Sequence, residues 1–418
     1  MFRFIKKPYL ITFLFFMSAC SSSKFQSYLK GATLYGRDGD NCSCHNSPKL
    51  PVDHSVKTGA DRIVEFLPDL KGKTVALVVN HTSTIKRTHL ADSLLSLGVK
   101  IKTIFAPEHG FRGTADAGEH VSNGIDRKTG LPIVSLYGSN KKPAPGQLEG
   151  IDVVIFDIQD VGTRFYTYTS TMHYVMEACA ENNKTLMILD RPNPNGHYVD
   201  GPVLQKKFSS FVGLNPVPIV HGCTVAELAL MINGEKWLKD GNECKLKIIT
   251  CLNYKHSMPY APPVAPSPNL PNLQSILLYP SICLFEGTVV SVGRGTDTQF
   301  QVIGSPDPEN GTYTFTPVEK PGAKNPPLKD TLCYGLDLRT VNARKEKFTL
   351  KYVLDLYQKS TQKDKFINRP KSFDLLAGSD SLRKLIQSGY SEKDIRKTWQ
   401  TDLDKYKNIR KKYLLYAE

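Results

Sequence analysis

The sequence predicts an α/β fold, in which a Rossmann-like parallel sheet with helices on both faces is followed by a smaller C-terminal α/β domain. Short β-branched apolar runs alternate with segments of helical spacing, which is typical of strand–helix–strand units in a parallel sheet. Polar motifs directly follow several of these runs. Because the loops at the carboxyl edge of such a sheet build its binding site, we expect the functional residues there.

Four apolar runs are expected to form buried strands. The first, TVALVV, shows no polar alternation after its first residue, which is typical of a strand that is covered on both faces. The expected strands are Thr74–Val79, Val99–Phe105, Val153–Phe156 and Thr185–Leu189.

Helical spacing of apolar residues marks several other segments. Gly98 is a natural stop for the first of them, Thr224 and Glu227 form the pattern of a capping box, and Ser391 suits an N-cap. The expected helices are Thr88–Leu97, Ser170–Asn182, Leu350–Tyr357 and a final one from Ser391 to Leu415. We interpret three further segments, Ser275–Leu284, Thr288–Val292 and Gln299–Ile303, as strands or mixed elements.

The length of 418 residues indicates two domains after removal of a targeting segment. The proline-rich segment from Pro259 to Pro271 is the best candidate for the boundary, because such a segment is rigid and extended. We therefore assign residues 1–20 to a lipoprotein signal peptide, 21–56 to a polar tether, 57–262 to a Rossmann-like catalytic domain and 263–418 to an auxiliary C-terminal domain.

The N-terminus has the layout of a secretory signal. Basic residues precede an apolar run, Leu10–Met17, which is too short to span a bilayer, and Ser18 and Ala19 then lead to Cys20. Small residues before a cysteine resemble the bacterial lipobox, so Cys20 is the expected lipidation site. We expect a lipid-anchored protein of the bacterial cell envelope, periplasmic or on the outer membrane. The alternatives are an ordinary signal peptide and an uncleaved anchor.

The nine cysteines are expected to play different parts. Cys42 and Cys44, near His45, lack the spacing for haem attachment and suit a disulfide or idle thiols. Cys244 and Cys251 are candidates for a disulfide in an oxidising compartment. The remaining internal cysteines lie in apolar runs and are interpreted as small core residues: Cys179, Cys223, Cys283 and Cys333.

The net charge of +14 is unevenly distributed, because residues 343–418 carry 19 Lys and Arg against 10 Asp and Glu. A basic face attracts nucleic acid, anionic lipid or acidic glycans. No nucleic-acid-binding motif accompanies it, so we expect no nucleic-acid partner. Membrane phosphates and peptidoglycan carboxylates are the expected partners of an exported protein, and a solvated face without a partner is the alternative.

The first motif, FAPEHGFRG, follows an expected strand. It places Glu108, His109 and Arg112 within five residues, so that one group exchanges a proton while another holds an anion. Glu119 offers a second carboxylate eleven residues later, and hydrolysis of a glycosidic bond usually needs two. The alternative is a salt-bridged polar loop.

Two further motifs follow strands. FDIQDVGTRFYTY offers carboxylates, an arginine and aromatic surfaces for a sugar ring, and LDRPNPNG offers a charged pair and amides in a stiff loop. Helix capping, an internal ion pair and plain turns are the alternatives. The candidate residues are Asp157, Gln159, Asp160, Arg164, Tyr166, Asp190, Arg191 and Asn193. His221, just before the capping box, is either a ligand contact or a helix-entry residue.

The last motifs, LFEGT and SVGRGT, place Glu286 and Arg294 in apolar, Gly-rich settings where an idle charge is costly. Several enzyme classes are disfavoured by missing patterns. The chain lacks a Walker loop, a G-x-G-x-x-G after the first strand, a G-x-S-x-G elbow and an H-E-x-x-H zinc motif. We expect neither a cofactor nor a metal.

Taken in order, the motifs resemble the exo-β-N-acetylmuramidase family, long catalogued as a domain of unknown function. The resemblance runs from about Thr58 to the end and is carried by FAPEHGFRG, FDIQDVGTRFYTYTSTM, LDRPNPNG, HGCTVAELA, PSPNLP, CLFEGT and SVGRGT. It implies a Rossmann-like domain, a smaller C-terminal domain and a cleft between them that takes the sugar. It also implies release of N-acetylmuramic acid from the non-reducing end of peptidoglycan fragments without a cofactor.

The resemblance favours Glu108 as the principal catalytic carboxylate, and our hypothesis is that it protonates the leaving oxygen. A second group would activate water or attack the sugar, and the candidates are Glu119, Glu286 and Asp160. Muramic acid carries a lactyl carboxylate, which suits an arginine, and an acetamido group, which suits Asn193. The arginine candidates are Arg112, Arg164, Arg191 and Arg294. A non-catalytic muropeptide-binding lipoprotein and a peptidoglycan amidase or esterase are the alternative functions.

Overall fold

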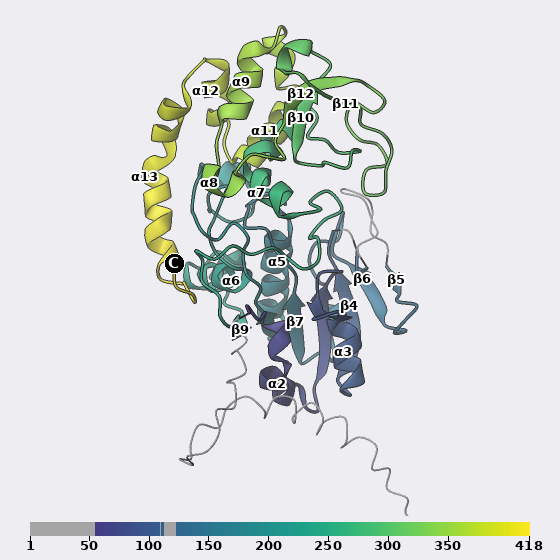
Figure 1. Ribbon diagram of the computed structural model, residues 1–418. Coiled ribbons are helices and arrows are strands. Elements are labelled where there is room, and N and C mark those ends of the chain that lie inside the picture. The colour runs from purple at the N-terminus through teal and green to yellow at the C-terminus, as the bar shows by residue number, and fades with distance from the viewer. Residues whose placement is uncertain (1–54, 109, 113–122) are drawn as a thin grey trace, which may run out of the picture. The chain divides into compact units, whose positions relative to one another are not determined.

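The computed structural model describes residues 55–108, 110–112 and 123–418, which are built on a seven-stranded sheet (Figure 1). The strand order is β5-β6-β4-β1-β7-β8-β9. Neighbouring strands from β6 to β9 are parallel, and β5 runs antiparallel to β6. The strands are β1 (Thr74–Val79), β4 (Lys100–Ala106), β5 (Gly124–Ile125), β6 (Pro132–Ser135), β7 (Val153–Asp157), β8 (Thr185–Leu189) and β9 (Lys245–Ile249). The four predicted strands and the predicted parallel sheet are confirmed.

The central strands separate two hydrophobic cores. Ala76 and Val78 of β1 belong to the core of α5 and α6, whereas the residues that alternate with them belong to the core of α2 and α3. Both faces of β1 are therefore covered, which explains why TVALVV lacks polar alternation. The covering helices are α2 (Ile63–Phe66), α3 (Leu90–Ser96), α5 (Tyr168–Glu181) and α6 (Val225–Gly234), and short helices η1 (Ala60–Arg62), η2 (Leu67–Leu70) and α4 (Pro145–Leu148) flank them.

Local capping decides where two of these helices begin. Helix α3 starts later than predicted, because Thr88–His89 form strand β3 against β2 (Thr84–Ile85) and the His89 ring accepts a hydrogen bond from Ala91 N. At α6 the predicted capping box is confirmed. The Thr224 hydroxyl accepts from Glu227 N, and the Glu227 carboxylate accepts from Thr224 N.

The C-terminal part adds a small antiparallel sheet and a set of helices. The sheet has the order β10-β12-β11, and residues of α7, α9, α11 and α13 share one hydrophobic core with α5 and α6. The elements are α7 (Leu273–Ile282), β10 (Val302–Ser305), β11 (Tyr313–Phe315), β12 (Cys333–Asp337), α8 (Ala343–Glu346), α9 (Lys351–Lys359), α10 (Lys363–Phe366), α11 (Pro370–Ala377), α12 (Ser381–Gln387) and α13 (Glu392–Arg410). Short helices η3 (Lys206–Phe208), η4 (Lys239–Gly241), η5 (Cys283–Gly287) and η6 (Pro308–Asn310) lie in the connections.

The interpretation of Ser275–Leu284 as a strand or mixed element was wrong. The segment forms α7 and continues into η5, and Asn272 caps it by accepting from Ser275 N at 3.0 Å. Every residue from Ser275 to Ile282 is buried, so the helix is apolar on all sides and lacks the 3.6-residue alternation that reveals a surface helix. Thr288–Val292 forms no regular strand; within it Ser291 makes an isolated bridge to Gly304.

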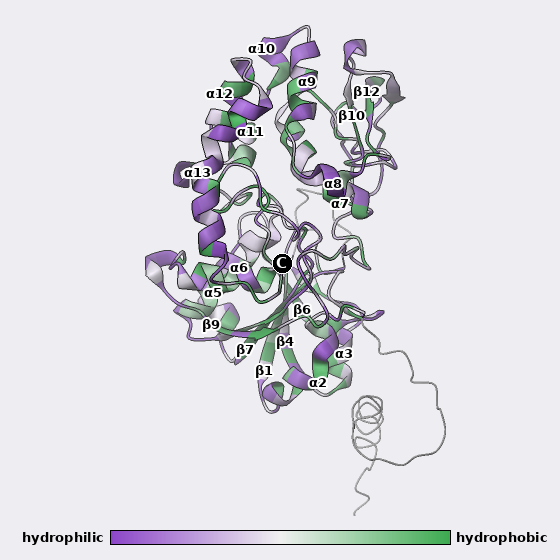
Figure 2. Cartoon of the chain, turned by 60° about the vertical axis from the view of Figure 1, so that its left-hand side comes forward, coloured by the Kyte–Doolittle hydropathy of each residue, from purple (hydrophilic) through white to green (hydrophobic). Residues whose placement is uncertain are grey.

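The last helix, α13, brings the chain back to the parallel sheet. Its N-cap is Ser391, as predicted, and its buried residues recur every three or four positions. Figure 2 shows the helix as largely hydrophilic, in contrast to the apolar strands of the sheet. Tyr406 donates to the carbonyl of His221 at 2.8 Å, and Arg410 donates to that of Gly222. The helix ends at Arg410, earlier than the predicted Leu415.

The predicted Cys244–Cys251 disulfide is absent, because the six cysteines that the structure describes are free and buried. Cys244 precedes β9 and Cys251 follows it. A strand rises about 3.3 Å per residue, so the two Cα atoms lie roughly 20 Å apart, whereas a disulfide needs less than about 7 Å. The predicted core cysteines are confirmed as buried: Cys179, Cys223, Cys283 and Cys333.

Several predictions lie outside the described residues. They concern the signal peptide, most of the tether, Cys20, Cys42, Cys44, His109 and Glu119. Within residues 55–108, 110–112 and 123–418, no helix combines the length and the apolar character needed to cross a membrane.

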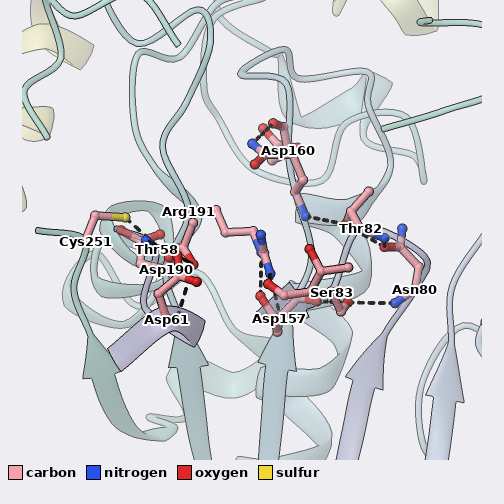
Figure 3. A network of polar contacts seen from close by, with 12 residues as sticks. Thr58, Asp61, Asn80, Thr82, Ser83, Asp157, Asp160, Asp190, Arg191 and Cys251 are labelled. Carbon is pink, nitrogen blue, oxygen red and sulfur yellow. Dashed lines mark hydrogen bonds and ion pairs between the residues drawn. The ribbon is translucent and has the colours of Figure 1, made fainter. Parts of the chain in front are cut away.

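A buried ion pair holds the carboxyl edge of the sheet together (Figure 3). Arg191, directly after β8, donates from Nε and Nη2 to the carboxylate of Asp157 at the end of β7, at 2.6 and 2.9 Å. It also donates to the carbonyl of Thr84 in the loop after β1. Burial opposes the charge of Arg191, but Asp157 raises the pKa of the guanidinium above its ordinary value. Three neighbouring strand ends thus share one guanidinium.

Replacing Arg191 with methionine should lower the free energy of unfolding by roughly 3–5 kcal/mol, because Asp157 would keep a buried, unpaired charge. Urea denaturation of the purified protein measures this loss. The matched control is Arg339→Met, which breaks the solvent-exposed pair with Asp337 and should change the stability far less. Equal losses in the two variants would contradict the role given to the buried pair.

Candidate active site

A cavity of about 480 Å³ lies where the carboxyl edge of the sheet meets the C-terminal part. Its walls come from the loops after β4 and β6, the start of α5, the segment before α7, and α7 with η5. Two carboxylates of the described residues line it, Glu108 and Glu286. Parallel strands therefore place one acidic side chain here, and the C-terminal part places the other.

Glu108 follows β4 and is held by hydroxyl groups. The Thr167 hydroxyl, one residue before α5, donates to Oε2 at 2.8 Å, and the Tyr168 hydroxyl donates to the backbone carbonyl of Glu108 at 3.4 Å. The hydroxyl of Tyr137 is hydrogen-bonded to the carboxylate of Glu108. Burial and this carboxylate raise the pKa of Tyr137 above its usual value. The carboxylate is thus oriented by groups from two separate loops.

Glu286 lies in η5 and forms an ion pair with Arg294. Nε of Arg294 donates to Oε1 at 2.7 Å, and Sγ of Cys283 lies 3.5 Å from Oε2. Burial opposes the charge of Arg294, but Glu286 raises the pKa of the guanidinium. The guanidinium carbon lies 5.0 Å from the ring centroid of Phe300. The attraction between Glu286 and Arg294 offsets the desolvation cost of placing two charges in an apolar segment.

Aromatic rings form much of the remaining wall. Tyr279 packs edge-to-face against Phe165 at 5.1 Å, against Phe300 at 5.0 Å and against Tyr166 at 6.1 Å. Tyr166 is fixed by a 2.7 Å hydrogen bond to the carbonyl of Pro266. Such rings present flat apolar surfaces of the kind that pack against a sugar ring.

Two further polar side chains, Asn269 and Lys141, line the cavity. Asn269 is the carboxamide that lines the cavity; its Nδ2 donates to the carbonyl of Gly322 at 2.8 Å. Its buried Oδ1 has no hydrogen-bond partner within the described part of the chain. Nζ of Lys141 lies 4.8 Å from the ring centroid of Phe211. No cluster of metal-ligating side chains occurs among the described residues.

Comparison with known proteins identifies this arrangement. The family model described as exo-β-N-acetylmuramidase NamZ, N-terminal, matches residues 75–274, and the corresponding C-terminal model matches residues 277–416. The chain belongs to the NamZ family. A peptidoglycan β-N-acetylmuramidase NamZ from Bacillus subtilis is 38% identical over 420 residues, which cover 93% of this chain and 99% of that protein.

Two crystal structures of DUF1343 family proteins from Bacteroides fragilis have the same fold. One is 47% identical, with a TM-score of 0.81, and covers 87% of this chain and 99% of its own. The other is 30% identical, with a TM-score of 0.76, and covers 86% of this chain and 99% of its own. The predicted membership of the exo-β-N-acetylmuramidase family is confirmed.

The structure brings four of the predicted site residues of this NamZ family member to the cavity: Glu108, Tyr166, Glu286 and Arg294. Nine others do not line it: Arg112, Asp157, Gln159, Asp160, Arg164, Asp190, Arg191, Asn193 and His221. Most of these nine form hydrogen bonds or ion pairs with other parts of the chain near the edge of the sheet, because buried polar groups must be hydrogen-bonded.

The predicted role of Arg112 and Arg164 in holding the substrate is not supported by their contacts. Arg112 is paired with Asp126 through Nε and Nη2 at 3.2 and 2.8 Å. Arg164 is fully buried and donates to the carbonyls of Pro202, Val217 and Leu376, the last of them in α11. Burial lowers the pKa of Arg164 to about 9. Arg164 therefore ties the loop before α5 to the C-terminal part.

Asp160 and His221 form a buried pair, and neither residue lines the cavity. Asp160 accepts from Gly162 N at 2.6 Å, and its Oδ2 lies 3.6 Å from Nε2 of His221. His221 also accepts from Cys223 N, at the entry to α6, so the helix-entry interpretation fits its contacts. Gln159 donates to the carbonyls of Asp160 and Pro192.

Asn193 does not reach the cavity, because both ends of its amide are occupied. Nδ2 donates to the carbonyl of Cys223 at 2.8 Å, and Oδ1 accepts from Asn195 N at 2.8 Å. The polar groups after β8 therefore stiffen the loop rather than face a ligand.

Sequence reasoning missed several functional side chains of the cavity, among them Tyr137, Lys141, Phe211, Tyr279 and Phe300. Tyr137 and Lys141 follow β6, a short strand that was not predicted. Recognition of PIVS as a strand would have placed them at the same edge as Glu108. In the sequence, Phe211 lies far from the end of any strand, and nothing in its local sequence indicates a role in binding.

Asp190, after β8, latches the C-terminal tail. Tyr416 donates to Oδ2 at 2.6 Å and accepts from Cys251 N, while Oδ1 accepts from Ala226 N at 3.0 Å. Burial raises the pKa of this carboxyl to about 6 from its ordinary 3.8. The folded state thus binds this proton more tightly than the unfolded state does.

The stability that this proton contributes should be present below about pH 4 and lost as the pH rises through 6. A shift of about two units corresponds to about 3 kcal/mol. Urea denaturation of the native protein and of Asp190→Asn, from pH 4 to 7.5, measures it. The stability difference, native minus variant, should fall by that amount with rising pH. Asp355→Asn, which removes an exposed ion pair, is the control. A stability difference for Asp190→Asn that changes with pH no more than the difference for Asp355→Asn would contradict the assignment.

Proposed function

We propose that the protein is an exo-acting glycoside hydrolase that releases N-acetylmuramic acid from the non-reducing end of peptidoglycan fragments. One observation carries the proposal: Glu108 and Glu286 share an aromatic-walled cavity in a NamZ-family chain. Hydrolysis of a glycosidic bond uses two carboxyl groups around one sugar. The choice of exo attack and of muramic acid rests on the family and on the Bacillus subtilis relative.

The two carboxylates have different settings, which suggests different roles. Glu108 is held by hydroxyl groups, and we assign it the protonation of the leaving oxygen as the glycosidic bond breaks. Glu286 is ion-paired with Arg294, which suits a carboxylate that takes a proton from water or attacks the anomeric carbon. We assign the role of second catalytic group to Glu286 rather than to Asp160, because Asp160 is buried and does not line the cavity. Glu119 lies outside the described residues and stays a prediction.

The sugar ring has a place between these groups. Tyr166, Tyr279 and Phe300 offer apolar faces, and Asn269 is the carboxamide best placed for the acetamido group. Asn269 takes over the role predicted for Asn193, whose amide is occupied elsewhere. An ordered aromatic wall limits the poses of the sugar and so aligns its glycosidic oxygen with the carboxyl groups.

The cellular location follows from the N-terminal sequence. The basic start, the apolar run and the small residues before Cys20 support cleavage before this cysteine and its lipidation. We therefore place the enzyme in the bacterial cell envelope, held to a membrane by lipids on Cys20. A peptidoglycan-degrading activity has its substrate in that compartment.

Glu108→Gln and Glu286→Gln should each lower kcat on a chromogenic N-acetylmuramide by about 10²–10⁴-fold, because each removes one proton-transfer or nucleophilic group. Glu149→Gln, at an exposed position outside the cavity, is the matched control and should keep normal turnover. Release of free N-acetylmuramic acid from a muramyl disaccharide by the native protein excludes a binding lipoprotein and an amidase or esterase. Near-normal turnover of Glu108→Gln would sink its assignment.

Replacing Cys20 with serine should move the protein from the membrane fraction to the soluble fraction of a bacterial expression host. The lipid chains supply the membrane affinity, and serine cannot carry the thioether. Immunoblots of separated fractions measure the change, with Cys179→Ser, at a buried core position, as the control. Retention of Cys20→Ser in the membrane would contradict the lipid anchor and favour an uncleaved N-terminal segment.

A further inference from the structure

Among the described residues, the cavity has one cation that is not paired with a carboxylate. Arg294, the other cation on the wall, is ion-paired with Glu286. Lys141 forms no ion pair within the described ranges, and its ammonium lies over the ring of Phe211. A half-buried ammonium beside an aromatic ring keeps a positive charge available for a ligand.

The neighbouring lysine shows the contrast. Nζ of Lys142 is bound to Glu177 at 3.1 Å and to Glu181 at 2.7 Å, both on α5, and Lys142 does not line the cavity. Lys142 therefore anchors this segment to α5 by its charge. The preceding residue of the same segment reaches the cavity.

An aromatic platform fixes the position of Lys141. Phe211 stacks on Tyr174 with an interplanar angle of 15° and a centroid distance of 6.3 Å, and Tyr137 packs against it at 6.1 Å. Tyr137 also contacts the carboxylate of Glu108. The ammonium thus belongs to the same wall as the group that we assign to the leaving oxygen.

The substrate carries an anion that needs such a partner. N-acetylmuramic acid differs from N-acetylglucosamine by a lactyl ether that ends in a carboxylate. Three of the arginines predicted to hold this carboxylate are bound elsewhere in the fold. Arg112 pairs with Asp126, and Arg191 pairs with Asp157. Arg164 donates to backbone carbonyls. The fourth, Arg294, holds Glu286.

We propose that Lys141 recognises the lactyl carboxylate and is the residue that makes the enzyme prefer muramides. The proposal rests on the proposed function, since it concerns the substrate of that same cavity. An ammonium ion pairs with a free carboxylate but gains no charge interaction with a neutral lactyl amide or with a sugar that lacks the lactyl group. Lys141 is therefore a specificity-determining residue, separate from the groups that transfer protons.

The test compares two chromogenic N-acetylmuramides, one with a free lactyl carboxylate and one with the same group as a methylamide. Lys141→Met keeps the apolar stem over Phe211 and should raise KM for the free acid by roughly 10–100-fold, with kcat changed less than about threefold. KM for the methylamide should stay unchanged. Lys141→Arg should restore most of the affinity, and Lys405→Met, the control at an exposed position of α13 outside the cavity, should behave as the native protein on both substrates.

The outcomes separate the two proposals. Loss of the acid-over-amide preference in Lys141→Met supports the role of Lys141. An equal loss on both substrates, or none on either, overturns it while leaving the glycosidase intact. If the native protein cleaves neither muramide, the proposed function fails. Calorimetric titration with N-acetylmuramic acid then decides the role of Lys141: tighter binding by the native protein than by Lys141→Met supports it, and equal binding overturns it.

Discussion

The buried ion pair between Asp157 and Arg191 is the contact on which the catalytic edge of this protein depends. It joins the end of β7 to the loop after β8 and, through the carbonyl of Thr84, to the loop after β1. Ser83 donates to the carbonyl of Asp157, and the hydroxyl of Thr82 accepts from Gln159 N at 3.0 Å (Figure 3). Parallel strands bring these groups to one edge, and burial makes their pairing obligatory.

The cavity is completed by distant parts of the chain. Glu108 comes from the parallel sheet, whereas Glu286 comes from η5, which lies in the C-terminal part. Arg164 and helix α13 connect the two parts through backbone carbonyls, and the tail residue Tyr416 is held by Asp190. The two parts also share one hydrophobic core, and both carboxylates line the same cavity.

Charged side chains that already have a partner within the protein play structural roles in this fold, and those without one are available to a ligand. The planar guanidinium of arginine donates several hydrogen bonds to carboxylates and carbonyls. In this fold, three arginines of the family motifs bind the protein's own backbone carbonyls and carboxylates. Lys141 is a compact charge on a flexible stem, beside an aromatic ring and without an ion-pair partner among the described residues. A ligand carboxylate meets less competition there than at any of those arginines.

The sequence by itself determined the parallel sheet, the capped helices, the family and the candidacy of Glu108 and Glu286, because apolar periodicity and strand-end motifs are local signals. Only the tertiary structure decided which polar residues face the cavity. Asp157, Asp190 and Arg191 carry the same motif signal as a binding residue, yet all three are buried: Asp157 and Arg191 pair with each other, and Asp190 holds the C-terminal tail. Sequence shows that a charge follows a strand, but whether it meets a ligand or another loop depends on what packs across the edge. The helix α7, apolar on every side, escaped prediction for the same reason, since its surroundings come from distant elements.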